Sequence, residues 1–199
     1  MIRRVRLAQP LVALTILLAA SAAGAPAAPL PTYTLDATKS TLQFAFVQAG
    51  GQNTGRFPKL AVNFTFADDN LAASRLEVPV DVAALDTGDK ERDDTLRSAD
   101  LFDVAKFPQS RFVATAITKT AAGAYEASGS LVLRGVTRAL RVPFTLRGAT
   151  EQGRRVLYMT GKTLIKRLDF GVGQGDWKST EWVGNDVTIT FNLRLVAAN

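Results

Sequence analysis

Hydrophobic and polar residues alternate along most of the chain from Tyr33 onward. Alternation with a period of two is typical of β-strands that bury one face and expose the other. Two further runs, 111–117 and 156–165, are strand-like but apolar on both faces. All these runs together predict about eight strands. The clearest alternating runs occupy residues 42–46, 60–66, 76–82, 125–133, 140–146 and 187–195.

One segment departs from the alternation. Residues 87–102 are highly charged, and their few apolar residues recur at roughly helical spacing. Thr87 and Asp89 are residue types that commonly cap the N-terminus of a helix. We therefore expect one or two short helices within residues 87–103.

Turns rich in Gly, Asp and Asn separate the strand runs, and no internal repeat or linker divides the chain. Residues 30–197 are therefore expected to form one all-β domain. Pro79 and Pro143 fall inside two of the runs. Because proline cannot donate a hydrogen bond to a neighbouring strand, both indicate a sheet edge or a bulge.

An antiparallel chain of this kind can form either a sandwich or a closed barrel, and strand pattern alone does not separate them. The expected buried face combines several phenylalanines with the very small residues Ala114, Ala116, Ala127 and Gly129. Eight strands closed into a barrel leave room for one small ligand. Small residues on one wall and phenylalanines on the other therefore favour a barrel with an elongated apolar cavity.

The first residues have the layout of a secretory signal peptide. Arg3, Arg4 and Arg6 precede an apolar stretch at 11–20 and a small-residue stretch at 21–28. We expect residues 1–23 to be removed, with cleavage after Ala23 or as late as residue 28, and the protein to be exported to the periplasm. The apolar stretch is too short to cross a bilayer.

Charge and composition exclude several classes of function. Three of the 24 basic residues and none of the 18 acidic ones lie in the signal segment, so the remainder carries a net charge of +3. That charge is too small to indicate a nucleic-acid partner. The absence of Cys and His excludes disulfides, thiol or imidazole catalysis and His- or Cys-ligated metals.

Acidic residues concentrate between Asp86 and Asp103, where seven acids accompany three bases. Paired carboxylates of this kind can carry out general acid–base hydrolysis, and a solvated helix face has the same composition. A hydrolase using the 86–103 cluster therefore remains an alternative. We find no other catalytic motif.

Several short motifs occur in an order that resembles the YceI-like family of periplasmic polyisoprenoid-binding proteins. The resemblance extends from about Tyr33 to Leu195. Its most specific stretch contains Asp86-Thr-Gly88, Arg92-Asp93, Leu96-Arg-Ser98, Asp100-Leu-Phe-Asp103 and Phe107-Pro108. Other matching segments are Tyr33-Thr-Leu-Asp36, Gly55-Arg-Phe57, Gly135-Val-Thr137 and Arg167-Leu-Asp-Phe-Gly171. Many family members carry histidines where this chain has Gln48 and Thr95, so a role that depends on imidazole is not expected here.

The resemblance implies an extended, lipocalin-like, eight-stranded antiparallel barrel without catalytic activity or cofactor, holding an isoprenoid lipid or quinone in its lumen. Arg92 and Arg97 are candidates to contact a head group, because arginine binds phosphate with a two-pronged fork. Alternatively, Arg92 pairs with Asp86 or Asp103 and holds the helical segment in place, and Arg167 pairs in the same way with Asp169. Further hypotheses are a homodimer and a stress-related partner of a membrane quinone enzyme. The residues expected to line the lumen are Phe44, Phe46, Phe57, Val62, Phe64, Phe66, Val78, Val80, Leu101, Phe102, Phe112, Ala114, Leu131, Leu133, Val142, Phe144, Phe170, Ile189 and Phe191.

Overall fold

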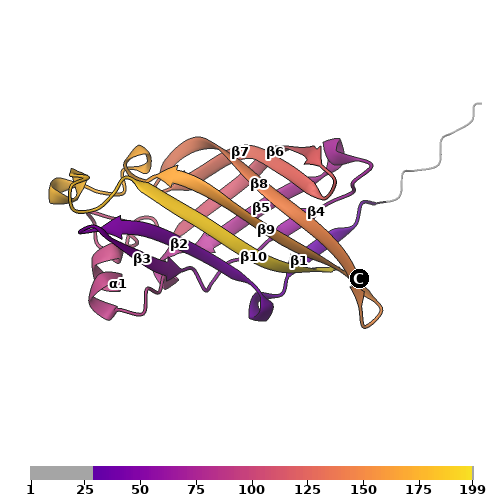
Figure 1. The fold of residues 1–199 in the computed structure, drawn as a ribbon, viewed down its shortest axis with the longest axis horizontal. Coiled ribbons are helices and arrows are strands. Elements are labelled where there is room, and N and C mark those ends of the chain that lie inside the picture. The colour runs from indigo at the N-terminus through magenta and orange to yellow at the C-terminus, as the bar shows by residue number, and fades with distance from the viewer. Residues whose placement is uncertain (1–28, 199) are drawn as a thin grey trace, which may run out of the picture.

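Ten antiparallel strands form one sheet that closes on itself (Figure 1). The structure is a computed structural model and describes residues 29–198, so the expected signal peptide lies outside the described residues. The strands are β1 (Thr32–Leu35), β2 (Thr41–Gln48), β3 (Gly51–Arg56), β4 (Asn63–Thr65), β5 (Arg75–Asp81), β6 (Gln109–Ala121), β7 (Ala124–Leu133), β8 (Val136–Glu151), β9 (Arg154–Lys166) and β10 (Asp186–Ala197).

Closure of the barrel depends on β10, which is long enough to pair with two short strands along one of its edges. One edge of β10 pairs with β9, and the other pairs first with β2 and then with β1. β1 and β2 in turn pair with β4 and β3. β1 and β2 therefore form one interrupted barrel strand, and β3 and β4 form another. The barrel thus has eight strands in the order expected of a closed antiparallel barrel. The predicted fold class is confirmed.

Two short strands were missed by the alternation pattern. β1 is only four residues long, and a 3-10 helix at Ala37–Lys39 separates it from β2. β3 has the sequence GQNTGR, which has no apolar face, and it is held by its backbone pairing with β2. The apolar run at 60–66 contributes only the three residues of β4.

A bulge in β6 explains why one predicted strand is apolar on both faces. The register against β7 shifts between Ala114 and Ala116. Ala114 therefore faces the interior, whereas Ala116 is exposed and Ile117 becomes the next buried residue. Gly129 lies opposite the bulge, where an added Cβ would approach the Val113 carbonyl oxygen to 2.1 Å.

Each proline lies just past the end of one ladder, in a strand that stays paired on its other side, and not at a free edge of the sheet. β5 pairs with β4 only as far as Glu77, two residues before Pro79. The Ala61 amide still donates to the Pro79 carbonyl oxygen at 3.0 Å. β8 pairs with β9 from Glu151–Arg154 to Phe144–Gly161, so Pro143 lies immediately beyond the ladder. Past that point the Thr163 hydroxyl donates to the Arg141 carbonyl at 3.1 Å.

Helical segments gather mainly at one end of the barrel. The α-helix α1 (Lys90–Arg97) confirms the helix expected within 87–103, and it lies beside the β2–β3 turn, opposite the C-terminal end (Figure 1). No helix among residues 29–198 is long and apolar enough to cross a membrane. Short 3-10 helices occupy Ala37–Lys39, Leu71–Ala73, Val82–Ala84, Arg167–Phe170 and Gly175–Lys178.

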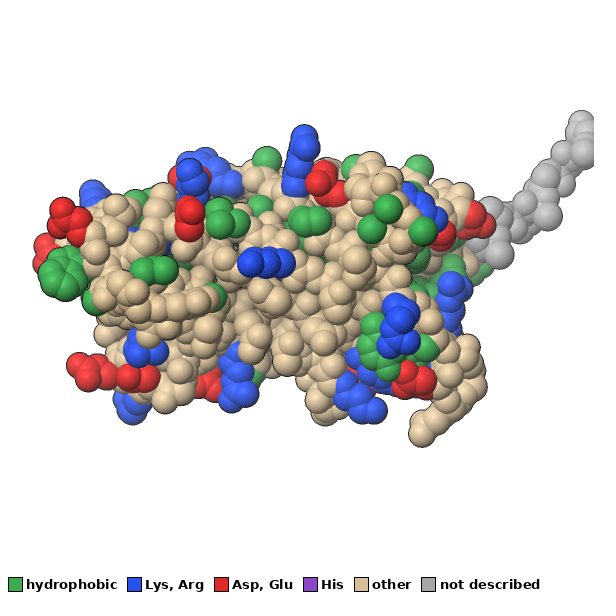
Figure 2. Space-filling model, in the orientation of Figure 1, with side chains coloured by type: hydrophobic (Ala, Val, Ile, Leu, Met, Phe, Trp, Pro, Cys, Tyr) green, Lys and Arg blue, Asp and Glu red, His purple; other side chains and the backbone are tan. Residues whose placement is uncertain are grey.

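The interior contains two hydrophobic clusters, one at each end of the barrel. The cluster at the C-terminal end is built around Tyr33, Phe64 and Leu195, and the other around Phe44, Phe57 and Leu101. Outside, acidic and basic side chains are interspersed with single hydrophobic ones (Figure 2). The large exposed hydrophobic residues in the described part of the chain are Val47, Val132, Leu164 and Trp182.

Candidate binding cavity and its mouth

An apolar cavity of about 700 Å³ lies between the two clusters. Alternation places every second side chain of the long strands on its wall. At its closed end, five rings form an aromatic plug: Tyr33, Phe64, Phe66, Tyr125 and Phe144. Successive centroids are 6.2, 5.1, 5.3 and 5.5 Å apart, distances at which aromatic pairs attract. The cavity therefore ends on a packed floor, to which Phe144 contributes directly.

Most residues expected to line the lumen do lie on the cavity wall. The wall also includes Leu42, Leu140 and Val187, which belong to the same alternating runs and could have been chosen by the same signal. The expected residues found on the wall are Phe44, Phe46, Phe57, Val78, Val80, Leu101, Phe102, Phe112, Leu131, Leu133, Val142, Phe144, Ile189 and Phe191.

The remaining expected residues occupy other positions. Val62, Phe64, Phe66 and Ala114 belong to the closed-end cluster, below the cavity floor. Phe170 packs in the cluster at the opposite end. Alternation identifies the buried face of a strand, but it does not say whether that face meets a cavity or other side chains.

Two glycines make room for aromatic rings of the neighbouring strands. A Cβ on Gly55 would come within 2.3 Å of the Phe44 ring, and one on Gly161 within 2.3 Å of the Phe191 ring. Each glycine is the cross-strand partner of the phenylalanine it accommodates. The expected combination of phenylalanines with very small residues therefore does occur, with Phe44 and Phe191 on the cavity wall and Gly55 and Gly161, rather than Ala114, beside their rings.

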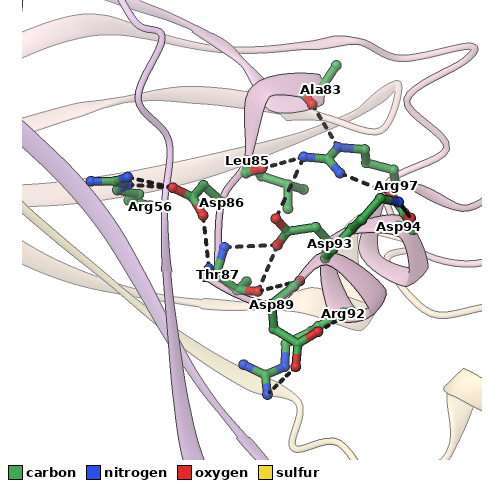
Figure 3. Close-up of polar contacts among 12 residues, drawn as sticks. Arg56, Ala83, Leu85, Asp86, Thr87, Asp89, Arg92, Asp93, Asp94 and Arg97 are labelled. Atoms are coloured by element: carbon green, nitrogen blue, oxygen red, sulfur yellow. Dashed lines mark hydrogen bonds and ion pairs between the residues drawn. The ribbon is translucent and has the colours of Figure 1, made fainter.

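Residues 85–103, which contain the most specific of the family-like motifs, lie beside the cavity mouth, and we call this segment the cap. Asp89 begins α1 by accepting a hydrogen bond from the Arg92 amide at 3.1 Å. The buried Asp93 carboxylate accepts hydrogen bonds from both the amide and the hydroxyl of Thr87, at 2.8 and 2.7 Å (Figure 3). Asp93 thereby ties the helix to the chain that precedes it.

The two candidate arginines have different positions in the cap. Arg97 donates to the carbonyl oxygens of Ala83 and Leu85 at 2.9 and 2.5 Å, so it anchors α1 and does not border the cavity. Arg92 does border the cavity, and its Nη2 lies 3.7 Å from the Asp89 carboxylate. The alternative that Arg92 pairs with Asp86 or Asp103 was wrong: Asp86 pairs with Arg56 at 2.6 Å, and Asp103 with Lys106 at 3.3 Å.

The Asp86 contacts predict that the cap weakens in acid. The Gly88 amide, at 2.9 Å, and the Arg56 guanidinium both hold the pKa of Asp86 below its ordinary value. A carboxyl whose pKa is lower in the folded than in the unfolded protein stabilises the fold above about pH 4, and this stabilisation is lost as the pH falls through the folded-state pKa. We expect the midpoint of urea unfolding to fall between pH 5 and pH 3, and to fall less in Asp86→Asn.

The control for this experiment is Asp69→Asn, which removes an exposed carboxylate from the turn after β4. It should keep the pH dependence of the original protein. An Asp86→Asn variant with the same acid sensitivity as the control would contradict the assigned role of Asp86. Asp36, Asp68, Asp94 and Glu151 also have lowered pKa values, so some acid sensitivity will remain in every variant.

A second arginine organises the other side of the mouth, in a segment we call the mouth loop (residues 172–184). Arg167 is 4% exposed, and its guanidinium donates five hydrogen bonds to carbonyl oxygens. Burial lowers the pKa of Arg167. Its expected relationship with Asp169 is not a side-chain pair; the acceptors are the carbonyl oxygens of Val172, Trp177, Ser179, Val183 and Gly184, at 2.7–3.0 Å.

Several carboxylates of the acidic cluster at 86–103 form hydrogen bonds or ion pairs within the cap. Asp86 and Asp93 hold the cap together, and Asp94 pairs with Lys90. Among residues 29–198, no three Asp or Glu side chains lie close enough to hold a metal ion. These contacts give the carboxylates structural roles at the mouth.

Comparisons with known proteins agree with this architecture. The family model described as the YceI-like domain matches residues 33–195. A UPF0312 protein of Vibrio vulnificus is 31% identical over 136 residues, which cover 67% of this chain and 68% of the relative. One of Yersinia enterocolitica is 38% identical over 94 residues, covering 47% and 48%.

Two solved structures have the same fold. BcnA of Burkholderia cenocepacia is 31% identical, with a TM-score of 0.74 over 80% of this chain and 98% of that one. A polyisoprenoid-binding domain from Saccharophagus degradans, described as implicated in plant cell wall breakdown, is 20% identical, with a TM-score of 0.66 over 83% and 98%.

Proposed function

The chain belongs to the YceI-like family, and from this membership and the apolar cavity in its barrel we propose that it is a binding protein for an isoprenoid-type lipid. The polyprenyl chain or the tail of an isoprenoid quinone occupies the lumen. The protein would carry, store or sequester this molecule, and it requires no cofactor to do so. The polyisoprenoid-binding description of the Saccharophagus degradans domain supports the same ligand class.

The observation that carries the proposal is the shape and lining of the cavity. Its volume of about 700 Å³ falls in the range of small-molecule sites, and its wall is apolar down to the aromatic plug. Each buried CH₂ group of a ligand contributes about 0.8 kcal/mol. Polar side chains occur mainly at the mouth, so the lining matches an amphiphile with a long apolar tail and a small polar head.

We further propose that the protein acts after export, in the periplasm, since residues 1–23 have the composition of a signal peptide. Mass measurement of protein recovered from a periplasmic extract tests this proposal. A mature chain that begins between residues 24 and 29 would support it. A full-length chain recovered from the cytoplasm would contradict it.

Blocking the lumen should abolish binding without unfolding the barrel. Val142 lies on β8 and lines the cavity, so Val142→Trp fills space that the ligand needs. Protein purified from its own host is analysed by native mass spectrometry, and the bound lipid is then extracted and identified. We expect the substitution to reduce the retained lipid at least tenfold, while the thermal midpoint changes little.

The matched control is Val132→Trp on the adjacent strand β7, where the side chain is 36% exposed on the outer surface. This variant should retain lipid like the original protein. Equal lipid retention by Val142→Trp and the original protein would show that the lumen is not the binding site. Absence of lipid from both Val132→Trp and the original protein would contradict the proposed function itself.

A further inference from the structure

The aromatic plug seals the end of the cavity that lies opposite the mouth. Each of its five rings is at most 5% exposed. Phe144 borders the cavity, and its ring stacks on that of Tyr125, its cross-strand partner on β7, with the centroids 5.5 Å apart. The other four rings pack behind Phe144 and do not border the cavity. A lipid tail that enters through the mouth therefore meets the Phe144 ring as its floor.

Polar contacts hold the plug in place from behind. The Tyr125 hydroxyl donates to the Asp68 carboxylate at 2.8 Å, and Lys119 Nζ donates to the same carboxylate at 2.6 Å. Burial and the contact with Asp68 raise the pKa of Tyr125 to about 12, so the hydroxyl remains a donor at neutral pH. The Phe66 amide donates to the Pro31 carbonyl oxygen at 3.0 Å. The rings of the plug are thus tied to the chain around them.

The volume between the mouth and this floor determines how much of a tail the lumen can hold. That volume is about 700 Å³. One water molecule takes about 30 Å³ of liquid volume, and a carbon atom with its hydrogens is of similar size. An isoprene unit has five carbon atoms and therefore needs about 150 Å³. The cavity has room for about five such units.

We infer that the aromatic plug limits the length of the isoprenoid tail that the lumen can bury, to about five isoprene units. This inference rests on the proposed function. A shorter tail is buried completely, whereas a longer tail is stopped by the Phe144 ring and leaves its remaining units outside the mouth. Burial of each CH₂ group stabilises the complex, so the units left in water contribute nothing to binding. The protein therefore prefers tails that end within this limit.

Transfer of lipids from vesicles measures this limit, because a bilayer buries tails of every length. We suggest farnesol, geranylgeraniol, hexaprenol and octaprenol, each in dioleoylphosphatidylcholine vesicles that are mixed with delipidated protein. The vesicles are removed by centrifugation, and mass spectrometry measures the ratio of protein-bound to vesicle-bound lipid. Farnesol and geranylgeraniol lie within the limit and should give similar ratios. The ratio for octaprenol should be at least tenfold lower, with hexaprenol between.

Two variants at the closed end should move the limit in opposite directions. Phe144→Ala removes the ring that forms the floor, and it should raise the hexaprenol ratio at least threefold. Met159 lines the cavity and belongs to the closed-end cluster, so Met159→Trp fills space above the floor and should lower the hexaprenol ratio at least threefold. Farnesol uptake should be unchanged in both variants, which also shows that each is folded. The matched control is Leu164→Ala on β9, where the side chain is exposed, and it should keep the original ratios.

The possible outcomes separate this inference from the proposed function. Octaprenol that the original protein takes up as readily as geranylgeraniol would overturn the inference alone. A hexaprenol ratio that stays the same in Phe144→Ala and Met159→Trp would show that the plug does not set the limit. If Phe144→Ala does not fold, Met159→Trp decides this point. Failure of the original protein to take up any of the four prenols would overturn the proposed function and the inference with it.

Discussion

Replacing Arg167 by methionine is expected to unfold the mouth loop and to lower the free energy of unfolding by about 3–5 kcal/mol. The substitution leaves up to five carbonyl oxygens without their donor, among them those of Val172 and Val183, whose hydrogen bonds to Arg167 are fully buried. An unsatisfied buried acceptor costs about 1–3 kcal/mol, and part of this cost is recovered where water enters. Urea unfolding followed by far-UV circular dichroism measures the loss.

Two further variants make this result specific. Arg167→Lys supplies three donors from one nitrogen and should recover only part of the stability. Arg138→Met removes an exposed guanidinium that donates to the Asp169 carbonyl at 3.1 Å, and it should cost less than about 1 kcal/mol. If Arg167→Met were as stable as Arg138→Met, the carbonyl groups of the mouth loop would have other partners in solution.

The second large effect is expected at Gly161, where alanine should lower the free energy of unfolding by about 1–3 kcal/mol. The new Cβ would lie 2.3 Å from the Phe191 ring and 2.5 Å from the Pro143 carbonyl oxygen. Because the Phe191 ring lines the cavity, its displacement should also weaken ligand binding. Thermal unfolding and lipid retention measure the two consequences.

Gly148→Ala is the matched control on the neighbouring strand β8. Its Cβ would meet only the Leu157 side chain, at 3.7 Å, which is ordinary van der Waals contact. We expect a change within about 0.5 kcal/mol, as for surface substitutions away from special features. Equal stability of the two alanine variants would show that the Phe191 ring can move at little cost.

Much of the fold could be predicted from the sequence because burial on one face of a strand leaves a period-two signal. The signal fails where no face is apolar, as in β3, and where an extra residue changes the parity, as at the Ala114–Ala116 bulge. The strand pattern could favour a closed barrel but could not establish it, since closure depends on β10 pairing with β1 as well as with β2. That pairing joins residues from opposite ends of the domain.

The site was harder to predict than the fold. Phe64 and Phe144 have the same alternating context, yet Phe64 belongs to the plug alone and Phe144 also lines the cavity. Arg92 and Arg97 share one helix, and only the folded structure shows that Arg97 is committed to carbonyl groups. Sequence pattern shows which residues are buried or charged, but the roles of these residues depend on contacts between distant segments.

The early end of the β8–β9 ladder has a mechanical consequence. Between the β8–β9 turn and the Phe144–Gly161 pair, the two strands are joined by backbone hydrogen bonds. Beyond that pair, Thr163 Oγ1 donates to the Arg141 carbonyl oxygen and Arg138 Nε to the Asp169 carbonyl oxygen. Contacts of this kind open at lower free energy than a continuous ladder. The closed half of the barrel is thus expected to be more rigid than the half that contains the cavity mouth. We therefore expect the mouth end of the barrel to widen more readily than the closed end, so that the cost of this widening limits the width of a molecule that enters.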